Sequence, residues 1–184
     1  RLYQGRLAVT CITDNELLNG RPLPQDHAYR NFLLRCLAMN RPELDDEFIM
    51  SDDDYRPLVE VDLSFFIRDG RYQAFYFYDL DQWIDVIRAP TSYDLSMLRT
   101  NEFLKRNGYP NLQYASHMPQ IMRKEWYLDM LKEHSGLEES GCCEWSTYFN
   151  YSIKRYPEAF DVRPYVTMSW PELVTSWYPM MEPQ

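Results

Sequence analysis

The hydrophobic pattern changes its period within the first 80 residues, and this change restricts the fold more than any other feature of the sequence. Residues 27–40 carry apolar side chains at helical spacing, with Asp26 in position to cap the helix. Residues 58–65 instead alternate apolar and polar side chains. The turn sequence Asp69-Gly70 follows, and the aromatic run 71–78 returns, which predicts an antiparallel hairpin.

Two apolar segments flank the predicted helix. Residues 7–12 are apolar and β-branched, which is typical of a buried parallel strand, and residues 48–50 indicate a second short buried strand. A strand, a helix and a second strand in succession favour a parallel pair. The sequence therefore predicts an α/β fold with a mixed sheet, mostly parallel but including an antiparallel hairpin, and flanked by helices.

The rest of the chain predicts further helices and short strands within one domain, 1–184. The expected helices cover residues 92–106 (closed by Asn107-Gly108), 119–134, 141–155 and 169–177, with an ambiguous short helix at 79–88. The expected strands are 112–115 and 162–168. We expect these later helices to cover the faces or one flank of the sheet.

Charge and composition exclude some classes of protein. The 184 residues include 28 acidic and 19 basic side chains, a net charge of −9, which argues against binding nucleic acid by bulk charge. No apolar run approaches the roughly 20 residues of a membrane span, and no signal peptide is visible. The start at Arg1 rather than at a methionine leaves room for a preceding N-terminal segment.

The four cysteines favour a reducing compartment, so we expect a cytoplasmic protein. Cys11 and Cys36 lie inside apolar runs and are predicted to be buried as small hydrophobic residues. Cys142 and Cys143 are adjacent, and no CxxC spacing for zinc occurs. Nothing in this pattern indicates a disulfide framework.

Three consecutive carboxylates, Asp52-Asp53-Asp54, follow the predicted strand 48–50 directly. Ligands of open α/β sheets bind outside the carboxyl ends of the strands. Carboxylates packed this closely repel one another unless a cation lies among them, and their oxygens suit Mg²⁺ or Mn²⁺. The alternative is a solvated acidic loop, which is our interpretation of the upstream residues 43–47.

Two segments resemble the core of a GT-A fold glycosyltransferase: the helical segment Arg30-Asn31-Phe-Leu-Leu and the segment from Glu47 to Tyr55. The resemblance covers roughly the first 80 residues of the chain. The resemblance implies a nucleotide-binding half, 1–57, that ends in a DxD motif, and an acceptor-side half, 58–184. It implies that Asp52 and Asp54 bind Mn²⁺ or Mg²⁺ and that Asp53 faces the nucleotide-sugar diphosphate. A GT-A enzyme usually has another strand–helix unit before the strand that corresponds to residues 7–12. Either that unit precedes Arg1 or residues 7–12 are themselves the first strand, so the residues of the nucleoside pocket are not assigned.

The same resemblance implies further nucleotide-binding residues. Asp14, at the tip of the first predicted strand, would face the base or ribose; the alternative is a turn-forming residue. Arg30 and Asn31 would reach the nucleotide from the start of the helix; the alternative for both is a solvated helix face.

Two residues of the second half are candidates for catalysis. His117, in the segment His117-x-Pro119, would donate to a phosphate or bind the metal, and this segment also resembles Stealth-type sugar-phosphate transferases. Glu144 lies at the distance after DxD where many GT-A enzymes carry an acceptor-side carboxylate, which implies a general base or an orienting group. The alternatives are a structural histidine, and a helix carboxylate paired with Lys154 or an arginine.

The function expected from this sequence is that of a metal-dependent glycosyltransferase, with a UDP-sugar as donor and a glycan or other hydroxyl group as acceptor, as in polysaccharide biosynthesis. Sugar-1-phosphate transfer of the Stealth type is the enzymatic alternative. A non-catalytic carbohydrate- or protein-binding module, whose acidic triplet is only a cation site or a loop, is the other. A nuclease is disfavoured because no basic strand or helix is present to bind phosphates.

Overall fold

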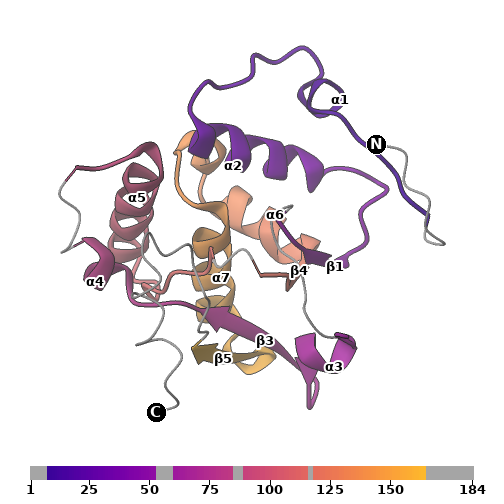
Figure 1. The fold of residues 1–184 in the computed structure, drawn as a ribbon, viewed down its shortest axis with the longest axis vertical. Helices are drawn as coiled ribbons and strands as arrows, with labels where there is room; N and C mark the ends of the chain where they lie inside the picture. Colours follow the sequence, from indigo (N-terminus) through magenta and orange to yellow (C-terminus); the bar gives the residue numbers. More distant parts are fainter. Residues whose placement is uncertain (1–7, 53–59, 85–88, 116–117, 165–184) are drawn as a thin grey trace, which may run out of the picture.

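A computed structural model describes residues 8–52, 60–84, 89–115 and 118–164, which form a mixed α/β fold (Figure 1). The helices are α1 (Asp14–Leu18), α2 (His27–Ala38), α3 (Leu63–Phe66), α4 (Leu80–Ile84), α5 (Ser92–Arg106), α6 (Lys124–Glu133) and α7 (Glu144–Arg155). The strands are β1 (Glu47–Met50), β2 (Ile67–Arg68), β3 (Arg71–Tyr76), β4 (Gln120–Arg123) and β5 (Phe160–Pro164). Two short 3₁₀ helices are η1 (Leu137–Glu139) and η2 (Pro157–Ala159).

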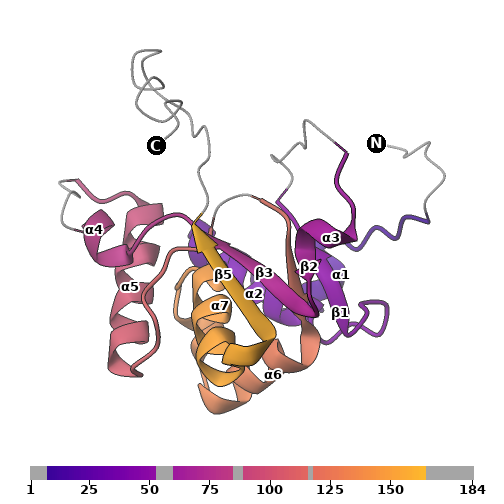
Figure 2. The ribbon, with the colours of Figure 1, turned by 90° about the horizontal axis from the view of Figure 1, so that it is seen from below.

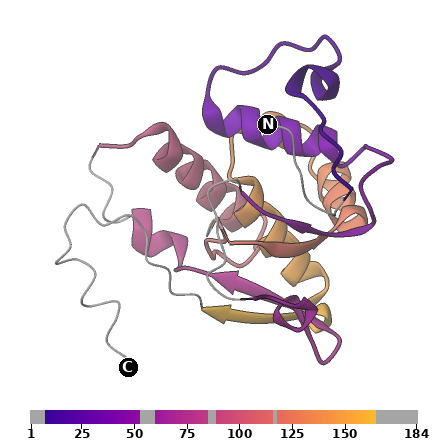
Figure 3. The same ribbon diagram turned by 45° about the vertical axis from the view of Figure 1, so that its right-hand side comes forward.

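Helix α7 lies at the centre of the molecule, between α2 on one side and strands β3 and β5 on the other (Figures 1 and 3). Its residues from Glu144 to Ser152 are all buried. A helix that is buried all round must have partners on every face, and α7 contacts α2, α5 and α6. It carries no charged side chain between Glu144 and Lys154.

The strands form two small sheets. In the first, β3 pairs with β2 antiparallel and with β5 parallel, with Tyr72 opposite Phe160 (Figure 2). The Asp69-Gly70 turn between β2 and β3 has left-handed backbone angles, with φ of 52° and 74°. In the second sheet, β1 and β4 are antiparallel. The structure therefore contains a mixed sheet, as predicted. Among the described residues, however, the strand pairs are not mostly parallel, and they form two sheets and not one.

Neutral polar side chains connect the two sheets and α7 to neighbouring backbone segments with which they are not paired as strands. The Gln120 side chain accepts from the Phe75 backbone N–H at 2.8 Å and donates to the Tyr114 carbonyl at 3.2 Å. From α7, Asn150 bonds both the N–H (3.0 Å) and the carbonyl (2.7 Å) of Leu112. Because buried backbone groups need partners, these side chains fix the positions of neighbouring segments.

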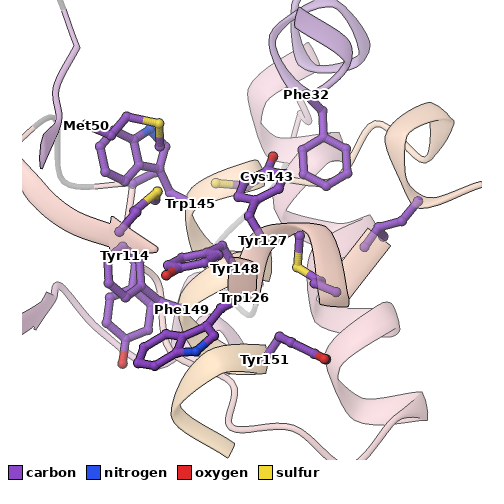
Figure 4. Packing of buried hydrophobic residues seen from close by; sticks show 14 of the residues in the cluster. Phe32, Met50, Tyr114, Trp126, Tyr127, Cys143, Trp145, Tyr148, Phe149 and Tyr151 are labelled. Carbon is purple, nitrogen blue, oxygen red and sulfur yellow. The ribbon is translucent and has the colours of Figure 1, made fainter. Parts of the chain in front are cut away.

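Aromatic side chains from α6 and α7 fill the core (Figure 4). The rings of Tyr127 and Tyr148 are stacked with centroids 5.6 Å apart, and those of Tyr114 and Phe149 with centroids 4.9 Å apart. Each such ring buries a large apolar area, and offset stacking adds a smaller favourable term. The aromatic residues of α6 and α7 therefore serve mainly to build the core.

Several predicted helices are confirmed with close to their expected bounds. Helix α2 begins after Asp26, whose carboxylate accepts from the Ala28 N–H at 2.9 Å. Helix α5 has the bounds 92–106 that the sequence predicts, and Asn107 caps it. Helix α7 begins three residues later than predicted and ends at Arg155, as predicted.

Four predicted segments are corrected by the structure, and one of them is the strand expected at 112–115, where only Leu112 forms an isolated bridge, to Asp79. Residues 8–12 form no strand, and Cys11 is exposed, not buried. Residues 60–62 are not in a strand and residues 63–66 form α3, so the hairpin is shorter than predicted. The helix expected from residue 119 begins at Lys124, because residues 120–123 form β4. The helix expected at 169–177 lies outside the described residues.

Strand β1 is confirmed but is only partly buried. Met50 is buried, whereas Ile49 is 46% exposed. Its partner β4 belongs to the second half of the chain, so the two predicted halves, 1–57 and 58–184, share a sheet. Among the helices that the structure describes, none has both the length and the apolar character that crossing a membrane requires.

Candidate functional site

Two distant segments of the chain meet at one end of the β1–β4 sheet. Met50 is paired with Gln120, so the residues that follow β1 and those that precede β4 leave the sheet at the same end. Asp52 is the second residue after β1. This end is where the sequence predicts a site, although the strands that form it are antiparallel and not parallel.

A third segment, the start of α7, joins this end through Arg35 of α2. The Arg35 Nη2 donates to Asp52 Oδ1 at 2.6 Å, and Nη1 donates to Glu144 Oε1. The guanidinium carbon also lies 5.2 Å from the ring centroid of Trp145, in a cation–π contact. We call Arg35, Asp52 and Glu144 the Arg35 cluster.

The local sequence explains why α2 and α7 present these side chains to each other. The Asp26 cap of α2 also accepts from Ser92 Oγ of α5 at 2.7 Å, which ties the start of α2 to α5. Before α7, Gly141 has φ of 65°, and a Cβ at this position would lie 2.6 Å from Cε2 of Tyr29. Only glycine therefore permits both the backbone angle and the close approach of α2.

The electrostatics of the cluster follow from burial. Burial raises the pKa of Glu144, and the neighbouring Arg35 cation opposes this shift only in part. Burial by itself would lower the pKa of Arg35, but Glu144 and then Asp52 outweigh it, so the pKa of Arg35 is raised. One guanidinium faces two carboxylates, so the ionised cluster keeps one negative charge.

The three side chains differ in their access to solvent. The side chain of Glu144 is 8% exposed, that of Asp52 18% and that of Arg35 21%. Glu144 is therefore the inner partner and Asp52 the outer one. This arrangement can hold two carboxylates at a fixed separation and bind a cationic or hydrogen-bonding group from the solvent side.

The site residues predicted from the sequence are brought together only in part. Asp52 and Glu144 meet in the Arg35 cluster. Asn31 lies one turn before Arg35 on α2, on the same helix face, and its Nδ2 is 3.3 Å from His27 Nε2. The structure therefore places Asn31 on the α2 face that carries the cluster.

Two other predicted residues lie apart from the cluster. Asp14 is exposed and is the first residue of α1, after the cap residue Thr13, and not at the tip of a strand. Arg30 is half-buried on α2, about 100° around the helix from Asn31. Asp53, Asp54 and His117 lie outside the described residues.

The described residues do not make a metal site by themselves. Among them, no three His, Cys, Asp or Glu side chains are grouped so that they could hold a metal ion. Asp52, the one described member of the acidic triplet, uses Oδ1 for Arg35.

Arg35 is the site residue that sequence reasoning missed. The amphipathic pattern of α2 makes it only one polar position of a helix face. A signal is present, because His27, Asn31 and Arg35 recur every four residues and so share one face. His27 also contributes to the site, since it adds a small lowering effect on the pKa of Glu144.

Two surface cavities lie elsewhere on α2. One, of about 510 Å³, is lined by residues of α1 and α2, including Leu17, Leu37 and Arg21. The other, of about 260 Å³, lies between α2 and η1 and shares Leu37 and Arg21. Neither is lined by a residue of the Arg35 cluster. We place the candidate site at the cluster, because there a buried carboxylate of raised pKa shares an arginine with a second carboxylate.

The chain was compared with protein-family models, with curated proteins and with solved structures, and none of the three comparisons finds a match.

Proposed function

We propose that this protein is a transferase that moves a sugar from a nucleotide sugar, with a UDP-sugar as the expected donor, to a hydroxyl group of a glycan. The observation that carries the proposal is the Arg35 cluster. It joins Asp52, at the end of β1, to Glu144, at the start of α7. These are the two described residues to which the GT-A resemblance assigns the metal and the acceptor sides of the reaction.

Glu144 is proposed as the general base. In the reaction, the acceptor hydroxyl transfers its proton to the Glu144 carboxylate while the acceptor oxygen bonds to the anomeric carbon of the donor. The bond from that carbon to the diphosphate breaks, and UDP leaves with the bonding electrons. The raised pKa of Glu144 supports this role, because a general base works best when its pKa lies near the working pH.

A divalent cation would supply positive charge to the departing diphosphate. The carboxylates that follow β1 are oxygen ligands of the kind that Mn²⁺ and Mg²⁺ prefer. The DxD resemblance implies Asp52 and Asp54 as the ligands and Asp53 as a contact of the diphosphate. Asp52 Oδ1 also accepts from Arg35 Nη2 at 2.6 Å.

Sugar-1-phosphate transfer is a second candidate, supported by a specific observation. The segment that resembles Stealth-type transferases leads directly into β4, whose first residue Gln120 is paired with Met50 at the end of β1. In this reaction the acceptor oxygen would bond to the β-phosphorus, the bond to the bridging oxygen would break, and UMP would leave. His117 is the proposed phosphate-binding or metal-binding residue.

A thermal-shift screen of nucleotide sugars, with and without Mn²⁺, tests the proposal. A nucleotide sugar that binds only the folded chain raises the melting temperature. Incubation with the stabilising donor and an acceptor then separates the candidates, since glycosyl transfer releases UDP and phosphate transfer releases UMP. Stabilisation without release of either nucleotide would identify a binding module, and no shift with any donor would end the transferase proposal.

A further inference from the structure

We infer that Arg35 is the resident cation of this site. It is a positioning residue that holds Asp52 and Glu144 together, and Asp52 is therefore a partner of Arg35 and not a metal ligand. The statement that Asp52 is not a metal ligand rests on the proposed function, whereas the role of Arg35 between the two carboxylates does not. The contacts of Arg35 carry the inference.

The guanidinium is held on three sides. Its two terminal nitrogens face Asp52 Oδ1 and Glu144 Oε1, and the face of the group lies over Trp145. Charge-assisted hydrogen bonds of this kind are about twice as strong as neutral ones. The planar fork of arginine can contact two carboxylates and an aromatic ring at once, which a lysine ammonium cannot do in the same geometry.

The positive charge of Arg35 already lies between the two carboxylates. A divalent cation that bound Asp52 Oδ1 and Glu144 Oε1 would need to displace the guanidinium from both of them. The displaced group would be costly to accommodate, because the side chain of Arg35 is only 21% exposed and a buried charge needs a partner. Asp53 and Asp54 lie outside the described residues, so the inference concerns Asp52 alone.

The cluster also connects Asp52, the second residue after β1, to α7. Arg35 bonds both Asp52 and Glu144. Removal of Arg35 would leave like charges facing each other. We therefore expect the effect of an Arg35 substitution on the free energy of unfolding to depend on whether Asp52 is charged. A double-mutant cycle measures this coupling.

The first test is a double-mutant cycle on the unfolding equilibrium, with Arg35→Gln, Asp52→Asn and the double variant in urea. We expect a coupling of about tenfold or more in the unfolding constant, as for side chains in one ion-pair network. The matched control is the cycle of Arg41 and Glu43, an exposed pair at 2.7 Å, for which about twofold or less is expected. A coupling at Arg35 and Asp52 no larger than the control would overturn the inference.

The second test measures binding of Mn²⁺ alone, by the loss of the free-ion electron-paramagnetic-resonance signal. We expect the Mn²⁺ affinity of Asp52→Asn to stay within about twofold of the unsubstituted protein, because Asp52 is not a ligand. An affinity about tenfold weaker would show that Asp52 binds the metal and would overturn the inference.

The two tests separate the inference from the proposed function. If Arg35→Gln fails to fold, Arg35→Met takes its place in the cycle, because the cycle needs a side chain without the charge, and the same coupling threshold decides. If the unsubstituted protein binds no Mn²⁺, the metal part of the proposed function fails. Asp52 is then not a metal ligand, as inferred, and the cycle alone decides the role of Arg35.

Discussion

Helix α7 contains two sets of buried polar groups that have different partners. In its first turn, Glu144 is bound to the side chain of Arg35 and through it to Asp52. In its middle, Ser146, Tyr148 and Asn150 bind backbone groups of other segments. Both sets lie in the interior, but one consists of charged groups and the other of neutral ones.

The difference teaches which set builds the fold and which serves the site. A neutral side chain that satisfies a buried backbone group is costly to remove, because the backbone group cannot leave with it. A buried ion pair offsets much of its own desolvation cost and is weak evidence for stability. The middle of α7 therefore belongs to the architecture, whereas the charged first turn is better explained by a function.

The largest effect on stability is expected from Asn150→Ala. The substitution leaves the N–H and the carbonyl of Leu112 without their partner, which lowers the free energy of unfolding by about 3 kcal/mol. Urea denaturation measures it. The control is Asn107→Ala, which removes one exposed bond to the Phe103 carbonyl and should cost about 0.5 kcal/mol. Equal losses in the two variants would contradict our division of α7.

The effect next in size is on the rate of sugar transfer, and it tests the proposed role of Glu144 in the first turn of α7. If Glu144 is the general base, Glu144→Gln should lower the rate of sugar transfer about 100-fold, as loss of a general base does. Released UDP measures the rate. Glu139→Gln, at an exposed glutamate of η1, should leave the rate unchanged. A Glu144→Gln variant that keeps its activity would favour the structural alternative, a helix carboxylate paired with an arginine.

A smaller effect is expected from Tyr148→Phe, in the neutral set. The variant leaves the Arg123 backbone N–H without its acceptor at 2.8 Å, and we expect a loss of about 1.5 kcal/mol in the free energy of unfolding. Tyr156→Phe, which removes a longer bond to Asp129 at 3.3 Å, should cost about 0.5 kcal/mol. Activity should be unchanged in both variants. A selective loss of activity in Tyr148→Phe would extend the site along α7.

The smallest effect is the pH dependence that Glu144 adds to stability. Its pKa is raised in the folded state above the ordinary value of 4.5, so the folded protein binds this proton more tightly than the unfolded chain does. The stability that this proton provides is complete below pH 4.5 and is lost as the pH rises through the raised pKa. A tenfold difference in proton affinity between the folded and unfolded chains corresponds to about 1.4 kcal/mol.

Urea denaturation at several pH values measures this contribution. The stability of the unsubstituted protein, minus that of Glu144→Gln, should fall with rising pH above 4.5. The same difference taken with Asn150→Ala should not change with pH, because that variant removes no titratable group. A rising difference for Glu144→Gln would mean that Arg35 outweighs burial at this carboxylate.

The predictions from sequence succeeded where local chemistry decides the structure. The bounds of α5 follow from the residues at its ends, with Thr91 as the N-cap and Asn107 at the C-cap. The Asp69-Gly70 turn is likewise confirmed, because its residues tolerate left-handed backbone angles. Helix caps and tight turns involve neighbours in sequence, so a single sequence contains the information.

The strand predictions failed at residues 60–66 and 8–12. Asp62 accepts from the Ser64 N–H at 2.8 Å and caps α3, so helix-cap chemistry prevailed over the alternating pattern there. Residues 8–12 have strand-like composition, but no described strand pairs with them. Strand propensity depends on the available partners more than helix propensity does.

The sequence by itself determined the helices with clear caps, the Asp69-Gly70 turn and the position of carboxylates directly after β1. Only the tertiary structure decided that β1 pairs antiparallel with β4, and that Arg35 lies between Asp52 and Glu144. The physical reason is distance along the chain. Periodicity and capping report contacts within a few residues, whereas this site is formed by side chains from three remote segments that only packing brings together.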